Sequence, residues 1–171
     1  MKKYTPIYIY GAIIILEGIF LLFSKHSTFE MIRLTTGILL TLGAVIAFVA
    51  AFSRQRQQVQ FAYHEMHALA MLVYGVSVLI FCNSFEKIIS VTAFLFIFYA
   101  LSEIIFCNWI LNLDQKSVYK IIVFRSLIGL AVGVGTFVSM NVPASTLQGF
   151  GILFIIVGVS ILLYVPVIKE K

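Results

Sequence analysis

Ionisable side chains inside apolar stretches are the residues of this chain best placed to do chemistry. Glu17, Glu103 and Arg125 each lie within a long run of aliphatic and aromatic residues. A charge in hydrocarbon is costly, so such residues are usually paired with one another or mark a path for protons or ions. Two hypotheses follow: the carboxyl groups are proton or cation sites, or they are clamps between helices.

Depth along the expected helices decides which of these charges can meet. At ~1.5 Å per residue, Glu103 and Arg125 both lie about 5 Å to the cytoplasmic side of the midplane, on consecutive helices. We expect an ion pair between them, acting as a clamp. Glu17 lies toward the outer side, where Arg33 can reach its level across the first outer turn. Alternatively Arg33 reaches the headgroups and leaves Glu17 protonated, so for Glu17 both hypotheses stay open.

His64, Glu65 and His67 form the one group with ligand-like spacing, because two imidazoles at positions i and i+3 share a helix face. The zinc-protease signature His-Glu-x-x-His is one residue longer, and the sequence offers no third ligand. We expect histidines packed at a helix start near the cytoplasmic interface, with no metal and no cofactor. Cys82 and Cys107 lie at opposite membrane depths, so we expect two free thiols rather than a disulfide.

The elements that must position these residues are six apolar segments. The chain has 171 residues, of which 61% are hydrophobic and 11% are charged, and a soluble surface cannot be built from that composition. Each segment is long enough to span a membrane, which takes roughly 17–25 residues, and none alternates as barrel strands do. The sequence therefore predicts an all-α membrane protein, a single domain of six transmembrane helices, over residues 5–24, 33–52, 63–82, 88–111, 121–140 and 147–168.

Basic residues are distributed unequally between the two ends of these helices. The richer side carries Lys2, Lys3, Arg54, Arg56, Lys116, Lys120, Lys169 and Lys171, whereas the other side carries Lys25, Arg33 and Lys87. By the positive-inside rule both termini are cytoplasmic. The formal charge of +5 is scattered among loops, which excludes a nucleic-acid interface. The partners expected are the lipid bilayer and either a second copy of the chain or another membrane protein.

Glycines mark one side of several of the expected helices. Small residues at such spacing let helix backbones approach closely, either within the bundle or between protomers, and internal packing is the favoured use. The glycines concerned are Gly11, Gly18, Gly129, Gly133, Gly151 and Gly158.

The chain divides into three units of two helices each, over residues 5–52, 63–111 and 121–168. The first helices share the segments that begin at Gly18, Gly75 and Gly133, and the second helices share those that begin at Gly37, Ala93 and Gly151. The weak similarity of these segments predicts three helical hairpin repeats.

This pattern resembles the HdeD-like membrane proteins, whose hairpins have a glycine-rich first helix, an Asn-Pro turn and a second helix of the form Gly-Ile-Leu-x(3–4)-Gly. The resemblance covers essentially the whole chain. The first two turns lack the proline, which only Pro143 in the third supplies, and Ala93 and Tyr99 replace the glycines of the middle unit.

The resemblance implies a multi-pass protein of the bacterial inner membrane with a non-enzymatic role in stress tolerance, acid resistance in the founding member. It provides no catalytic or ligand-binding motif to carry over to residues of this chain. The alternative is a small transporter or channel whose path passes Glu17 or Glu103.

Overall fold

The computed structural model describes residues 5–52, 61–111, 119–142 and 145–169. Within these ranges the side chains of residues 50–52, 61–66, 109–111, 119–121 and 164–169 are not described.

The described chain is all-helical, with six α-helices and one short 3₁₀ helix. Each predicted span coincides with one α-helix to within a few residues. Five α-helices are long and apolar enough to cross a membrane, and the apolar part described in the remaining one, α3, is the shorter stretch His67–Phe81. The elements are α1 (Thr5–Phe23), η1 (Ser24–His26), α2 (Phe29–Phe52), α3 (Phe61–Phe81), α4 (Phe85–Leu111), α5 (Tyr119–Met140) and α6 (Thr146–Lys169).

Short polar turns end one helix and begin the next at one end of the bundle. Thr28 precedes α2, and its hydroxyl accepts a hydrogen bond from the backbone N–H of Met31 (3.3 Å). Ser84 precedes α4 and accepts from the N–H of Lys87 in the same way (3.4 Å). Threonine and serine at such N-cap positions satisfy N–H groups that have no partner within the helix.

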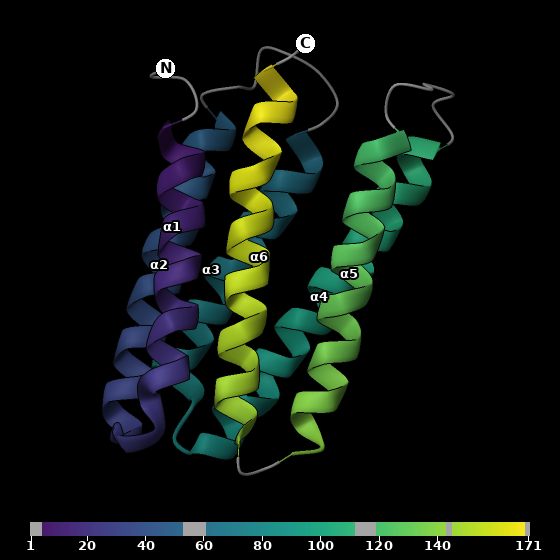
Figure 1. The fold of residues 1–171 in the computed structure, drawn as a ribbon. Coiled ribbons are helices and arrows are strands. Elements are labelled where there is room, and N and C mark those ends of the chain that lie inside the picture. The colour runs from purple at the N-terminus through teal and green to yellow at the C-terminus, as the bar shows by residue number, and fades with distance from the viewer. Residues whose placement is uncertain (1–4, 53–60, 112–118, 143–144, 170–171) are drawn as a thin grey trace.

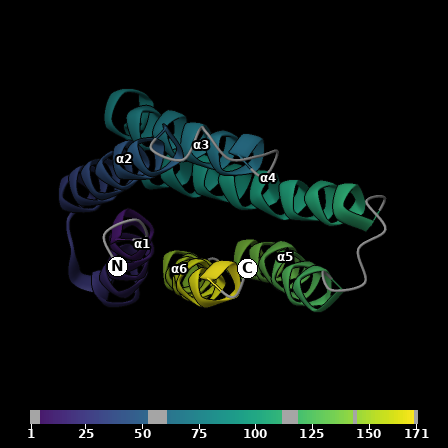
Figure 2. The ribbon, with the colours of Figure 1, turned by 90° about the horizontal axis from the view of Figure 1, so that it is seen from above.

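The helices run back and forth across the bundle, so that α1 begins and α6 ends at the same end (Figure 1). We call this the terminal end, and we call the opposite end, with the turns after α1, α3 and α5, the turn end. From above, α2, α3 and α4 form one row and α1, α6 and α5 form a second row (Figure 2). The apolar core lies between the rows.

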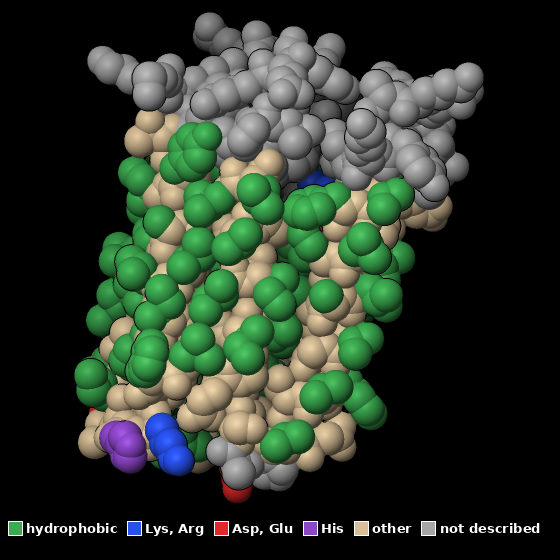
Figure 3. Space-filling view, in the orientation of Figure 1, with side chains coloured by type: hydrophobic (Ala, Val, Ile, Leu, Met, Phe, Trp, Pro, Cys, Tyr) green, Lys and Arg blue, Asp and Glu red, His purple; other side chains and the backbone are tan. Residues whose placement is uncertain are grey.

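The outer surface of the bundle is apolar between its two ends. Figure 3 shows hydrophobic side chains over most of the visible face, with a basic and a histidine side chain side by side at the turn end. Large side chains stand out from the bundle on several helices, including Phe23 (79% exposed), Phe94 (73%) and Phe137 (72%). Such a surface suits contact with lipid rather than water.

The closest approach of α1 to α6 depends on four glycines. A Cβ at Gly18 would lie 2.6 Å from the carbonyl oxygen of Gly151, and a Cβ at Gly158 would lie 2.9 Å from that of Gly11. Both contacts are with backbone, which cannot move aside as a side chain can. The predicted use of these glycines for packing within the bundle is therefore confirmed.

Two other helix pairs pack through small residues. Gly37 of α2 and Gly75 of α3 face each other, since a Cβ at Gly75 would lie 3.1 Å from the carbonyl oxygen of Gly37. On α5, a Cβ at Gly129 would lie 2.9 Å from the Cβ of Glu103, whereas a Cβ at Gly133 would meet only the Cβ of Ala100, at 3.5 Å. The glycine faces of α1, α3 and α5 thus contact α6, α2 and α4.

Gly18→Ala and Gly133→Ala form a matched pair of substitutions in helices. Alanine is favoured over glycine within a helix by about 0.5–1 kcal/mol, so Gly133→Ala should leave stability unchanged or raise it slightly. Gly18→Ala forces α1 away from the backbone of α6, and overpacking of this kind costs about 1–3 kcal/mol. The free energy of unfolding in detergent micelles measures both. Equal stability of the two variants would contradict the close contact of α1 with α6.

Candidate functional site

Glu103 of α4 and Arg125 of α5 form a buried ion pair in the half of the bundle nearer the terminal end. Arg125 Nε donates to Glu103 Oε2 at 2.7 Å, and Arg125 Nη2 donates to Oε1 at 2.8 Å. This two-pronged geometry matches the planar guanidinium to the carboxylate. The guanidinium carbon also lies 4.1 Å from the centroid of the Phe106 ring, a cation–π contact. The predicted Glu103–Arg125 pair is confirmed.

Gly129 makes room for this ion pair. It lies one helical turn after Arg125 on α5, and its lack of a side chain lets the Cβ of Glu103 come close to the α5 backbone. Both charged side chains are buried, with 9% of the Arg125 side chain and 3% of the Glu103 side chain exposed. The pair therefore holds α4 against α5 in an environment where either charge alone would be costly.

Three aromatic rings complete this polar layer. The ring of His67, on α3, lies 6.2 Å from the ring of Tyr10 on α1 in an edge-to-face arrangement, and 5.1 Å from the ring of Tyr99 on α4, between centroids. His67 also lies within electrostatic range of both Glu103 and Arg125. We call Tyr10, His67, Tyr99, Glu103 and Arg125 the Arg125 layer. It joins four helices in the core.

The burial of His67 differs from the interfacial position that the sequence suggested. Its side chain is only 7% exposed, because α3 turns this residue toward α1 and α4 rather than toward the terminal end. The side chains of His64 and Glu65, the other members of the ligand-like cluster, lie outside the described residues. Among the described side chains, no group of three or more His, Cys, Asp or Glu residues is placed to hold a metal ion.

Glu17 of α1 is completely buried, toward the turn end of the core. Thr36 of α2 donates a hydrogen bond to Glu17 Oε1 at 2.6 Å. Among the described residues, Glu17 Oε2 has no hydrogen-bond partner. Of the two alternatives left open for Arg33, pairing with Glu17 is not observed, because its guanidinium contacts Glu30 at 2.8 Å and donates to the carbonyl of Leu79 at 3.4 Å.

A second hydroxyl contact lies near Glu17. The Tyr74 hydroxyl of α3 lies 2.7 Å from Thr92 Oγ1 of α4, and Thr92 donates to the carbonyl of Ile88 at 2.6 Å. Because Thr92 has one hydroxyl proton, Tyr74 is the donor in the contact between them. Tyr74 is within electrostatic range of Glu17. We call Glu17, Thr36, Tyr74 and Thr92 the Glu17 layer; all four side chains are buried.

The two polar layers are separated by apolar side chains. Ile14 of α1 and Met71 of α3 lie one turn beyond Tyr10 and His67 and are buried (0% and 1% exposed). The core therefore alternates polar and apolar levels along the bundle. A proton moving between Glu17 and the Arg125 layer would have to cross this apolar level.

The hydroxyl-bearing members of both layers were not singled out from the sequence. Their partners come from other helices, so no local spacing connects them. One signal was available: Glu17, Thr36 and Tyr74 each come immediately before a glycine that packs against a neighbouring helix. A residue beside such a glycine also faces the interior.

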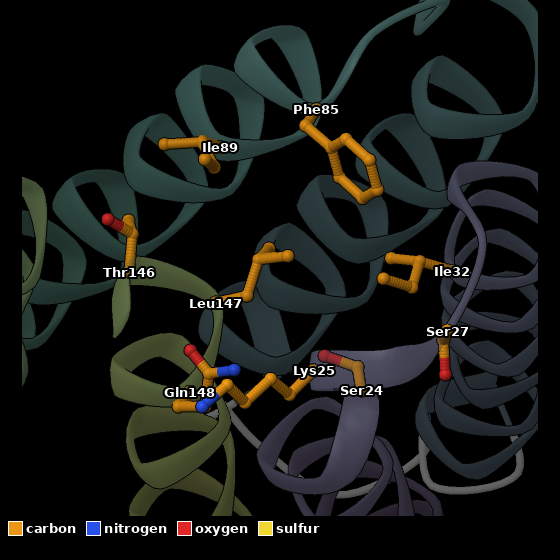
Figure 4. A pocket seen from close by; sticks show the side chains of 9 residues that line it. All are labelled: Ser24, Lys25, Ser27, Ile32, Phe85, Ile89, Thr146, Leu147 and Gln148. Carbon is orange, nitrogen blue, oxygen red and sulfur yellow. The ribbon is translucent and has the colours of Figure 1, made fainter. Parts of the chain in front are cut away.

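A pocket of about 260 Å³ opens at the turn end (Figure 4). Residues of η1 and of the starts of α4 and α6 contribute to it, and Lys25 and Gln148 extend along the same side. It lies outside both polar layers. Its lining residues are Ser24, Lys25, Ser27, Ile32, Phe85, Ile89, Thr146, Leu147 and Gln148.

Both cysteines are free and buried, as the sequence predicted. Cys82 follows α3 at the turn end, whereas Cys107 lies beside α5, where its thiol donates to the carbonyl of Ile122 at 3.6 Å. They behave as small packing residues.

Comparison of the chain with protein-family models, with curated proteins and with solved structures found no match.

Removing one partner of the Glu103–Arg125 pair should be more harmful than removing both. Glu103→Gln leaves the guanidinium without its counter-charge, and loss of one partner of a buried pair costs about 3–5 kcal/mol. We expect Glu103→Gln combined with Arg125→Met to recover a large part of that loss. The control is Glu30→Gln, which breaks the exposed pair with Arg33 at a cost of about 0–1 kcal/mol. Unfolding in detergent micelles gives all three values, and a double variant no more stable than Glu103→Gln would contradict a coupled buried pair.

Proposed function

We propose that this chain is a multi-pass protein of the bacterial inner membrane with a non-enzymatic role in tolerance of acid or envelope stress. The observation that carries the proposal is the placement of two carboxyl groups, Glu17 and Glu103, inside a bundle whose outer surface is apolar. Carboxyl groups enclosed in this way can respond to protons without contact with substrate. The resemblance to the HdeD-like membrane proteins gives this response a physiological setting.

A sixth membrane span is part of the proposal. The helix α3 has 21 residues, and at 1.5 Å per residue this is about 30 Å, the thickness of the hydrocarbon core. The helices that neighbour α3 carry hydrophobic faces, and these support a membrane span of the same depth for α3. Six spans place the start of α1 and the end of α6 on one side. The excess of basic residues near that side in the sequence supports a cytoplasmic location for both termini.

Three hairpin repeats are supported by the register of buried residues in α1, α3 and α5. Each of these helices buries four positions with the same spacing, and the position after the third holds a glycine in every case. The buried sets are Tyr10, Ile14, Glu17 and Leu21; His67, Met71, Tyr74 and Val78; and Arg125, Gly129, Val132 and Thr136.

The second helix of each hairpin supports the same register. Six buried positions recur with the same spacing in α2, α4 and α6. Two hydrogen bonds occupy corresponding positions in this register: the bond of Thr36 with Glu17 corresponds to the bond of Thr92 with Tyr74. The buried sets are Ile32, Thr36, Gly37, Leu40, Gly43 and Ala44; Ile88, Thr92, Ala93, Phe96, Tyr99 and Ala100; and Thr146, Phe150, Gly151, Phe154, Val157 and Gly158.

Survival of a deletion strain after acid challenge tests the stress role. We expect deletion to lower survival and the wild-type gene to restore it. Glu30→Gln, which changes an exposed carboxyl, should restore survival as well as wild type does. Glu17→Gln, present in the membrane in the same amount as the wild-type protein, should fail to restore survival, because the buried carboxyl is absent. Survival that is unchanged on deletion would contradict the stress role itself.

Proton transport is a second candidate function, and the observation that favours it is Glu17 Oε2, which has no hydrogen-bond partner among the described residues. A carboxyl with a vacant oxygen can exchange a proton, and intramembrane carboxyls commonly serve proton paths.

Proteoliposomes containing a pH-sensitive dye test this candidate. If Glu17 carries protons, an imposed pH gradient should collapse faster with the wild-type protein and with Glu30→Gln than with Glu17→Gln. Equal rates for the wild type, Glu17→Gln and protein-free vesicles would exclude proton transport through this site.

A further inference from the structure

We propose that Glu17 is a proton-binding site, at which the buried carboxyl is held as the neutral acid. The inference rests on the proposed membrane-embedded function and states in which form the Glu17 carboxyl occurs at neutral pH. It names the proton as the occupant of the Glu17 layer and assigns the Arg125 layer a different role.

No described cation lies within ion-pair distance of Glu17. On α2, Arg33 pairs with Glu30, and Lys25 of η1 lines the pocket at the turn end. The ionisable group that α3 places within range is Tyr74. The described part of α6, which packs closely on α1, has no ionisable side chain between Thr146 and Leu163. A proton is therefore the simplest way to neutralise this carboxyl.

The hydrogen bonds of Glu17 also suit the acid form. Thr36 donates to Oε1, so Oε1 is an acceptor and Oε2 is the oxygen that carries the proton. An O–H group without a partner is penalised less in the core than an unpaired buried ion. The neutral acid thus leaves a smaller penalty in the core than the carboxylate does.

The corresponding contact in the second hairpin is made by neutral groups. Tyr74 and Thr92 meet through two hydroxyls at the positions that correspond to Glu17 and Thr36. In the third hairpin the corresponding residues are Val132 and Phe150, which are fully buried. This level of the core is therefore built for uncharged groups, and an acid fits it only when protonated.

Glu103 provides the internal contrast. Its two oxygens accept hydrogen bonds from the Arg125 guanidinium, which neutralises the carboxylate without a proton. One carboxyl of the core is thus proton-bound and the other is cation-bound.

Infrared spectroscopy of the purified protein in lipid vesicles tests the proposal, because a protonated carboxyl has a carbonyl-stretch band distinct from that of a carboxylate. We expect this band at neutral pH in the wild type and in Glu30→Gln, and its loss in Glu17→Gln. Thr36→Val, which removes the hydrogen bond to Oε1, should shift the band to higher wavenumber. Thr136→Val is the matched control, since it removes another buried threonine hydroxyl, on α5 and outside the Glu17 layer, and should leave the band in place.

Two results would overturn the proposal: absence of the band from the wild type at neutral pH, or its persistence in Glu17→Gln. The Thr36→Val shift keeps the test decisive if Glu17→Gln does not fold, because an unshifted band would assign the proton to another carboxyl. The spectra require no cells, so they separate this site from the stress role. A Glu17 band together with normal survival of the deletion strain would support the proton site and reject the stress role.

Discussion

The contact of α1 with α6 holds the first and last helices of the chain together, and the enclosed core depends on it. Lipid is as apolar as leucine, so burial of apolar surface gives little drive for helices to associate inside a membrane. Close backbone packing must supply the attraction, and Gly11 and Gly18 of α1 allow it against Gly158 and Gly151 of α6. Without this contact, the face of α1 that carries Glu17 would be open to lipid.

Burial in the core makes an ionised carboxyl costly, and the two buried carboxyl groups are neutralised in different ways. Glu103 lies beside a guanidinium whose geometry matches it, and the pair is further held by the ring of Phe106. Glu17 lies beside hydroxyl groups that can share a proton but cannot neutralise a carboxylate. The Arg125 layer is therefore an ion-pair clamp, and the Glu17 layer is the proposed site of a bound proton.

Depth along the helices could be predicted from the sequence, whereas rotation about their axes could not. Helix ends and the levels of Glu103 and Arg125 follow from counting residues between polar turns, and the ion pair followed from those levels. Both the lipid-facing and the core-facing sides of these helices are apolar, so hydrophobic periodicity says little about which side faces inward. For this reason level alone allows Arg33 to pair with Glu17 as one of two alternatives, although α2 turns Thr36 to that carboxyl instead. His67 was placed at the interface for the same reason. The glycines were the exception, since close packing marks the inner side directly.

Comparison of the proposed repeats shows where the chain departs from its own symmetry. The positions that correspond to Glu103 hold Ala47 and Ile161, which are partly buried against the core, and those that correspond to Arg125 hold Tyr10 and His67. Among these corresponding positions, the Glu103 carboxylate and the Arg125 guanidinium thus occur only where the second proposed hairpin meets the third, and each is the counter-charge of the other. Among the described residues, Glu17 has no such partner at the junction of its own helix with α6, where glycines and aliphatic side chains make the close contacts. A buried carboxylate that has a counter-charge, such as Glu103, needs no proton to be neutral. A buried carboxyl without one, such as Glu17, does need a proton. This difference separates a clamp from a proton site.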